Sequence, residues 1–164
     1  MPFANRAEAG TRLADALDAY SGTDVVVLAL PRGGVPVAAE IASRLGAPLD
    51  LLIVRKIGVP SQPELAMGAV VDGAAPVVVR NDDVIRAAGV TEAEFARVRD
   101  RELAEIERRR ARYLAGRSPV EVGGRTLIVV DDGVATGATV RAALRGLRAK
   151  DPREIVLAIP VAPP

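Results

Sequence analysis

Two adjacent aspartates, Asp131 and Asp132, stand at the end of a short apolar run, Leu127–Val130. Such a run is typical of a strand buried on both faces of a parallel sheet. Ligands bind at the carboxyl ends of strands in open α/β sheets, so the paired acids are candidates for a binding role. Adjacent carboxylates repel each other unless hydroxyl or cationic partners offset the repulsion, which argues against a purely structural turn.

The segment after the two acids has the composition of an anion-binding loop that opens a helix. Small side chains let backbone N–H groups approach an anion, and the helix N-terminus favours its charge. The candidate residues are Gly133, Val134, Ala135, Thr136, Gly137, Ala138 and Thr139. A ribose phosphate suits both parts of the site. The carboxylates would accept hydrogen bonds from the 2′- and 3′-hydroxyls, and the loop would hold the 5′-phosphate.

Two more predicted strands end in groups that suit phosphate. Arg32, Gly33 and Gly34 follow the first strand; the arginine offers forked donors and the glycines allow unusual backbone angles. Arg55 and Lys56 end the second strand, where two cations could neutralise a pyrophosphate. Taken alone, the first is better interpreted as a plain turn, and the second has the common alternative of solvated surface charge. The proposal that these two segments bind phosphate therefore depends on their occurring together with the acid pair.

The scaffold that positions these residues is predicted from the hydrophobic pattern. Continuous apolar runs indicate buried strands, and apolar residues at helical spacing indicate amphipathic helices. We expect strands at 24–30, 49–54, 67–71, 76–80, 125–130 and 154–159, and helices at 5–20, 35–45, 81–89, 91–115 and 137–149. The Gly- and Pro-bearing segment 57–66 is expected to be a loop. This alternation predicts an α/β fold with a mostly parallel sheet and flanking helices.

The helix expected at 91–115 is densely charged. Thr91 and Glu94 form a capping box at its start, and its mostly polar surface indicates a peripheral position. The cluster Arg108, Arg109, Arg110 and Arg112 is interleaved with glutamates. We therefore interpret it as a solvated or subunit-facing surface and not as a nucleic-acid patch.

Composition narrows the functional classes. The 164 residues are 49% hydrophobic, which suits one domain spanning 1–164. With 22 Lys plus Arg against 21 Asp plus Glu, no global field recruits nucleic acid or membrane. The chain has no cysteine and no histidine, which excludes disulfides, thiolate catalysis and Ser-His-Asp triads. Without an apolar leader or a membrane-length apolar run, we expect a soluble cytoplasmic protein.

The segment Leu127–Thr139 resembles the 5-phosphoribosyl-1-pyrophosphate (PRPP) signature of the type I phosphoribosyltransferases. That signature has four apolar residues, two acids, two variable residues and a small or hydroxyl-bearing run ending in Thr or Ser. The resemblance implies a Rossmann-like three-layer fold. It also implies that the loop at Arg32–Gly34 binds pyrophosphate, with a non-proline cis peptide near Arg32–Gly33. It further implies a basic pair at Arg55–Lys56, before a mobile loop that closes over the reaction.

The resemblance also implies the reaction. A nitrogen nucleophile, on a nucleobase in the family's usual chemistry, displaces pyrophosphate at the anomeric carbon of PRPP, a step of nucleotide metabolism. The transition state resembles an oxocarbenium ion, so the protein's task is positioning and charge management. Asp131, Asp132 and Lys56 are the implied catalytic residues. Mg²⁺ would arrive with the substrate, near the two aspartates but without a direct protein ligand.

The acceptor is not identified by the sequence. Ala135 stands where hypoxanthine-guanine enzymes place an aspartate, which disfavours a 6-oxopurine without establishing adenine. In relatives the acceptor site comes from an N- or C-terminal excursion. Phe3 and Tyr20 are candidates in the N-terminal segment, although core packing is the commoner fate of such residues. The chain stops directly after a strand, so either its C-terminus is shortened or other segments cover that edge.

Two other functional classes stay open. A PRPP-binding regulatory protein would keep the sugar-phosphate site without transferase activity, and a structural domain with a vestigial site would bind no PRPP. A homodimer is what the resemblance implies about assembly.

Overall fold

The computed structural model describes residues 3–73, 75–114, 117–134 and 137–162. The chain divides into two units. The first comprises Met1–Leu52, Val120–Gly137 and Lys150–Pro164, and the second comprises Ile53–Pro119 and Ala138–Ala149. The acid pair therefore belongs to the first unit and the basic pair to the second.

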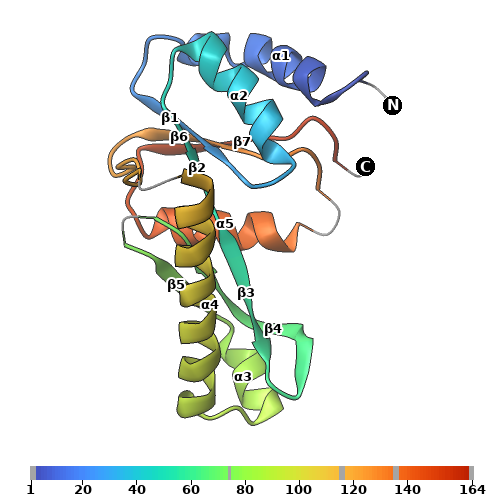
Figure 1. Cartoon of the computed structure of the whole chain (residues 1–164), viewed down its shortest axis with the longest axis vertical. Coiled ribbons are helices and arrows are strands. Elements are labelled where there is room, and N and C mark those ends of the chain that lie inside the picture. Colours follow the sequence, from blue (N-terminus) through green and yellow to red (C-terminus); the bar gives the residue numbers. More distant parts are fainter. Residues whose placement is uncertain (1–2, 74, 115–116, 135–136, 163–164) are drawn as a thin grey trace. The chain divides into compact units, whose positions relative to one another are not determined.

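The first unit is built on a four-stranded parallel sheet in the order β2-β1-β6-β7. Its strands are β1 (Val25–Ala29), β2 (Leu49–Leu51), β6 (Thr126–Val130) and β7 (Glu154–Ala158). The two central strands consist almost wholly of apolar residues and are buried along their length, as their sequences predict. Helix α2 (Gly34–Leu45) packs against β1, and α1 (Arg6–Ala16) packs beside α2 (Figure 1). A short 3-10 turn, Asp18–Tyr20, follows α1.

The register of β1 and β6 decides where the site forms. Val25 pairs with Thr126 and Ala29 pairs with Val130, so the two strands run level and end at the same edge. The backbone N–H of Leu30 extends the pairing by donating to the carbonyl of Val130 at 2.9 Å. The loops that follow the two strands therefore leave the sheet side by side.

The second unit contains a three-stranded antiparallel sheet in the order β3-β4-β5. Its strands are β3 (Val54–Val59), β4 (Gln62–Val71) and β5 (Val77–Arg80), and its helices are α3 (Asp82–Ala88), α4 (Glu92–Leu114) and α5 (Ala138–Arg148). Helix α5 packs against β4 and β5, whereas α4 packs against β3 and β4. The hairpin expected between 67–71 and 76–80 is confirmed as β4–β5.

Two sequence predictions fail between residues 49 and 66. The segment 57–66 is not a loop, because it forms the end of β3, a turn at 60–61 and the start of β4. The strand expected at 49–54 is divided, with β2 in the parallel sheet and Val54 opening β3. The glycine and the prolines sit at a bulge, at the turn, and in the stretch of β4 that pairs with β3 alone, where sheets tolerate them.

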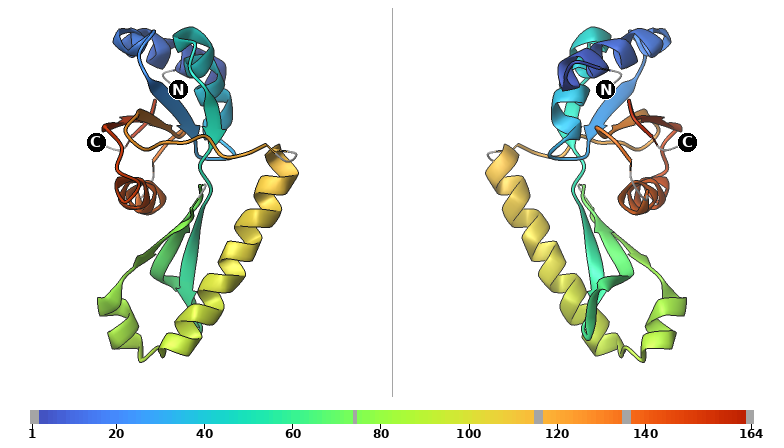
Figure 2. Two further views of the ribbon diagram at one scale, coloured as in Figure 1. Left: turned by 90° about the vertical axis from the view of Figure 1, so that its left-hand side faces the viewer. Right: turned by 90° about the vertical axis from the view of Figure 1, so that its right-hand side faces the viewer.

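Helix α4 runs alongside the β3–β4 hairpin (Figure 2). It begins with the expected capping box, which the structure confirms. Thr91 N donates to Glu94 Oε2 at 2.9 Å, and Glu94 N donates to Thr91 Oγ1 at 3.1 Å. The apolar residues Phe95, Val98 and Ile106 of α4 are buried. Within the described ranges, no helix combines the length and apolar character that crossing a membrane requires.

Ion pairs hold α4 to the hairpin and engage most of its arginine cluster. Arg110 pairs with Asp72, at 2.9 Å, in a site where the two side chains are 13% and 3% exposed. Arg108 and Arg109 both pair with Glu105 on the same helix. Three of the four arginines that suggested a basic patch are thus paired with carboxylates inside this unit.

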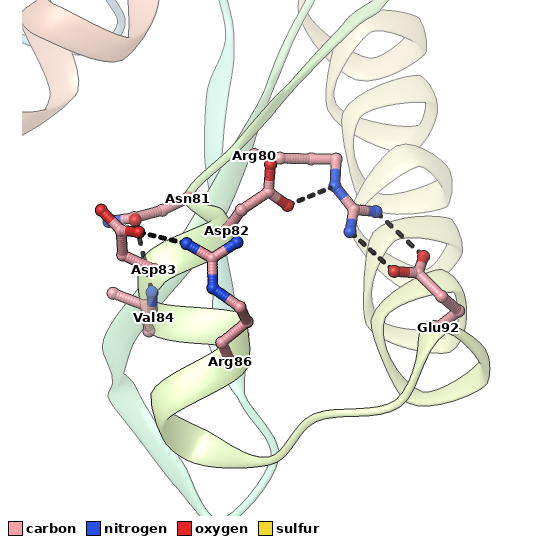
Figure 3. A network of polar contacts seen from close by, with 7 residues as sticks. All are labelled: Arg80, Asn81, Asp82, Asp83, Val84, Arg86 and Glu92. Carbon is pink, nitrogen blue, oxygen red and sulfur yellow. Dashed lines mark hydrogen bonds and ion pairs between the residues drawn. The ribbon is translucent and has the colours of Figure 1, made fainter.

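The end of β5 is tied to the start of α4 through Arg80 (Figure 3). Its guanidinium donates to both carboxylate oxygens of Glu92, at 3.1 and 2.8 Å, and to Asp82 at 3.1 Å. It also lies over the ring of Phe95, 4.4 Å from the centroid. Asn81 caps α3 by accepting from Val84 N, as predicted. The segment between β5 and α4, which contains α3, is therefore held by the Arg80–Glu92 pair across its ends and by the Asn81 cap at the start of α3.

Candidate functional site

The loop after β1 and the acid pair after β6 touch each other in the first unit. A Cβ built on Gly33 would lie 2.3 Å from the carboxyl carbon of Asp132, and one on Gly34 would lie 2.5 Å from the carbonyl oxygen of Val130. Gly33 has φ −60° and ψ −32°, and neither glycine has a positive φ. Glycine is therefore required at these positions because other atoms lie too close for a side chain. The unusual backbone angles expected from the sequence are not the reason.

Asp132 is held by an arginine that the sequence did not single out. Arg6, at the start of α1, donates from Nε at 3.0 Å and from Nη2 at 2.8 Å to Oδ2 of Asp132. The two side chains are 60% and 32% exposed. A cation in the first turn of a helix opposes the helix dipole, and that local mismatch is the signal that could have drawn attention to Arg6.

Asp131 lies beside Asp132, and both residues are partly buried. The backbone N–H of Asp132 donates to Oδ1 of Asp131 at 2.8 Å. Burial raises the pKa of the Asp131 carboxyl, the backbone N–H of Asp132 opposes that rise, and the side chain of Asp132 adds to it. The acid pair is therefore asymmetric: burial raises the pKa of Asp131, whereas Asp132 is paired with Arg6.

The Pro31–Gly34 loop presents an exposed cation. The side chain of Arg32 is exposed, and no described residue forms an ion pair or side-chain hydrogen bond with its guanidinium. The loop contains a non-proline cis peptide at Pro31–Arg32, one bond earlier than the expected position near Arg32–Gly33. Gly34 N donates to the carbonyl of Leu30 at 3.0 Å and begins α2.

The loop after the acid pair is described in part. Val134 N donates to the carbonyl of Val161 at 3.2 Å, which joins this loop to the segment after β7. Ala135 and Thr136 lie outside the described residues. Ala138 and Thr139 are exposed in the first turn of α5, which belongs to the second unit.

Arg55 and Lys56 were expected to end a strand of the parallel sheet. They lie instead within β3 of the antiparallel sheet. Arg55 Nε donates to Glu102 of α4 at 2.9 Å, so this side chain fastens the hairpin to the helix. Lys56 Nζ lies 3.4 Å from both the carbonyl and the carboxylate of Glu64. Lys56 lines a cavity of about 280 Å³ in the second unit, together with Thr139 and Arg141.

A larger cavity, of about 590 Å³, adjoins Asp132 in the first unit. Its lining includes Phe3, Asn5, Arg6 and Val161. Tyr20, the other aromatic candidate for an acceptor site, packs against the hydrophobic core and reaches Glu154 with its hydroxyl at 3.3 Å. Of the two aromatics, Phe3 alone lines this cavity.

Comparison with known proteins identifies the family. Residues 4–164 match the family model described as "Phosphoribosyl transferase domain". Two Mycobacterium tuberculosis proteins are each 50% identical to the chain over 161 residues: "Putative phosphoribosyl transferase MT0597" of strain CDC 1551 / Oshkosh and "Putative phosphoribosyl transferase Rv0571c" of strain ATCC 25618 / H37Rv. The match covers 98% of this chain but 36% of each relative, so the chain spans about a third of their length.

Solved structures show the same fold. The protein TT1426 from Thermus thermophilus is 42% identical with a TM-score of 0.82, covering 98% of this chain and 75% of that chain. A hypoxanthine-guanine phosphoribosyltransferase from Bacillus anthracis is 13% identical with a TM-score of 0.53, covering 97% and 69% of the two chains. The resemblance of the acid-pair segment and the predicted α/β class are both confirmed: the chain belongs to the phosphoribosyl transferase domain family.

Proposed function

We propose that the chain binds PRPP with Mg²⁺ and transfers its 5-phosphoribosyl group to a nitrogen acceptor, releasing pyrophosphate. The observation that carries the proposal is the contact between Gly33 and the carboxylate of Asp132. A loop with an exposed arginine and a pair of carboxylates, from two different strands, meet at one edge of a parallel sheet. PRPP carries a diphosphate and a vicinal diol on adjacent carbons, which suits this combination.

Each part of the first unit has a distinct task in this proposal. Asp131 and Asp132 accept hydrogen bonds from the ribose 2′- and 3′-hydroxyls and fix the sugar. Arg32 binds oxygens of the pyrophosphate through charge-assisted hydrogen bonds, and Gly33 and Gly34 let the backbone come close. Gly133 and Val134 begin the loop that we propose holds the 5′-phosphate.

The remaining candidates for this task follow the acid pair along the chain: Ala135, Thr136, Gly137, Ala138 and Thr139. Lys56 and Arg55 are the second unit's candidates for charge neutralisation. Arg55 pairs with Glu102 at 2.9 Å, whereas Lys56 lies 3.4 Å from the exposed Glu64, so Lys56 is the less tightly held cation and the stronger candidate.

Carboxylates at the sugar also suit the chemistry of transfer. As pyrophosphate leaves, positive charge develops on the ribose ring, and fixed negative groups stabilise it without reorganising. Mg²⁺ prefers oxygen ligands and keeps several waters, so it would arrive with PRPP and neutralise the leaving pyrophosphate. Carboxylate oxygens are the donor type that this ion accepts, directly or through water, so the two aspartates fit it.

The acceptor is proposed to enter the cavity that Asp132 shares with Phe3. The diol lies next to the anomeric carbon in ribose, so a nucleophile must approach close to the acid pair. The cavity lining is largely apolar, apart from Asn5, Arg6 and Asp132. A flat heterocycle such as a nucleobase suits such a lining.

A panel assay tests the proposal. The protein is titrated with PRPP and Mg²⁺ by calorimetry and then incubated with PRPP, Mg²⁺ and each of a set of purines, pyrimidines and other nitrogen heterocycles, while pyrophosphate release is followed. We expect binding, and pyrophosphate release with at least one acceptor. Binding without release on any acceptor would favour a PRPP-binding regulator, and no binding would refute the site assignment.

A further inference from the structure

The guanidinium of Arg6 contacts one of the two candidate diol-binding acids directly. We propose that Arg6 is a positioning residue, which orients the carboxylate of Asp132 so that its free oxygen faces the ribose hydroxyl. This inference rests on the proposed function, because it assigns a task to Asp132 that only a bound sugar reveals. Arg6 itself need not touch the substrate.

The hydrogen bonds around Asp132 leave one oxygen for a ligand. Both donors of Arg6, Nε and Nη2, are directed at the same atom, Oδ2 of Asp132. Among the described residues, no hydrogen bond is donated to Oδ1 of Asp132. The backbone of Gly33 lies against the carboxyl group, close to both of its oxygens. The carboxylate is thus held by Arg6 at one oxygen, while the other oxygen has no hydrogen-bond donor among the described residues and can accept one from a hydroxyl.

Electrostatics give Arg6 a second contribution to the same task. Asp131 and Asp132 are consecutive, and the side chain of Asp132 helps to raise the pKa of Asp131. A guanidinium stays protonated at all ordinary pH values and so offsets the mutual repulsion of the pair. Without Arg6, the two carboxylates should repel each other more strongly, and Asp132 should turn away from the position in which it accepts a hydroxyl hydrogen.

The competing explanation is that the pair merely anchors α1. Both side chains are substantially exposed, and exposed ion pairs contribute little to folding stability. The first unit offers a matched control in Arg44 of α2. Arg44 is 51% exposed and forms an ion pair with Asp15 of α1 at 3.0 Å, and no ion pair joins it to Asp131 or Asp132 among the described residues. Removing Arg44 takes one cation and one α1 anchor away without touching the acid pair.

Calorimetric titration with PRPP and Mg²⁺ at neutral pH separates the two explanations. We expect Arg6→Ala to weaken PRPP binding about tenfold at neutral pH, the loss of one hydrogen bond to a charged group. Arg44→Ala should bind as the unmodified chain does. Arg6→Lys should recover part of the affinity, because an ammonium can still donate to Oδ2 but lacks the planar fork.

Three outcomes would overturn the inference. Unchanged affinity in Arg6→Ala shows that Arg6 does not orient the acid, and equal losses in Arg6→Ala and Arg44→Ala show that it only anchors α1. Tighter binding in Arg6→Ala shows that Arg6 competes with the sugar for Asp132. If the unmodified chain binds no PRPP, it is the proposed function that fails, and that result is distinct from the other three.

Discussion

Replacing Gly33 with alanine puts a methyl group where the carboxylate of Asp132 lies. The backbone at Gly33 is helical, with φ −60° and ψ −32°, so alanine itself is not strained there. The new Cβ would lie 2.3 Å from the carboxyl carbon of Asp132, whereas ordinary contacts begin near 3.4 Å. The carboxylate must therefore move by roughly 1 Å, which is enough to break a hydrogen bond.

The expected costs differ between folding and binding. Asp132 is partly exposed and can swing outward, so folding loses mainly the Arg6 pair, about 1 kcal/mol or less. For a chain of this size that corresponds to a Tm lower by about 2–4 °C. PRPP binding loses a hydrogen bond to a charged acceptor, about 1.5–3 kcal/mol. That is roughly a 10- to 150-fold weaker Kd.

Calorimetric titration with PRPP and Mg²⁺, together with thermal unfolding, measures both quantities. Gly123→Ala is the matched control, since a Cβ there comes no closer than 3.5 Å to another residue. The double variant Gly33→Ala with Asp132→Ala should unfold at the temperature of Asp132→Ala alone, because the clash is gone, while its binding stays weak. Full-strength PRPP binding by Gly33→Ala would refute the reasoning, and so would a clash that Asp132→Ala does not relieve.

Three other variants probe separate parts of the structure. Asp131→Asn with Asp132→Asn should weaken PRPP binding far more than Arg108→Ala does; equal losses by calorimetry would contradict the site assignment. Asp131→Asn alone should raise the Tm near neutral pH, because the ionised carboxylate of Asp131 is the unfavourable form in the folded state. Burial raises the pKa of this carboxyl, so the carboxyl stabilises the fold below the ordinary aspartate pKa, and that contribution is lost as the pH rises through the raised pKa. That gain should vanish in acid, and a gain independent of pH would argue against burial as its cause. Arg110→Ala should lower the free energy of unfolding by about 3 kcal/mol, because Asp72 is buried beside it, whereas Arg108→Ala should cost less than about 1 kcal/mol; similar losses in urea denaturation would contradict this.

Local patterns in the sequence predicted the elements that depend on local chemistry. The continuous apolar runs before Pro31 and before Asp131 are strands, because burial on both faces leaves no room for polar alternation. Asn81 caps α3 and the Thr91–Glu94 capping box opens α4, since caps are decided within a few residues. The acid pair stands where a level β1–β6 register places it.

Features that depend on distant partners were not predictable in the same way. Gly58 and the prolines at 60 and 63 are typical of loops, so the local sequence predicts a loop at 57–66, where the structure has the tip of the β3–β4 hairpin. A Cβ on Gly58 would lie 2.4 Å from the carbonyl of Pro63, so the glycine serves the close approach of two strands. Arg6 lies 126 residues from Asp132 in the sequence, and no spacing rule joins them. Arg55 pairs with Glu102, 47 residues away on α4, and no local pattern predicts that contact.

The most direct measurement is a crystal structure of the protein with PRPP and Mg²⁺ bound. The account predicts the ribose hydroxyls within hydrogen-bond distance of the carboxylates of Asp131 and Asp132, with the pyrophosphate against the Arg32–Gly34 loop. A sugar bound elsewhere, or carboxylates that stay turned away from an occupied sugar site, would contradict it.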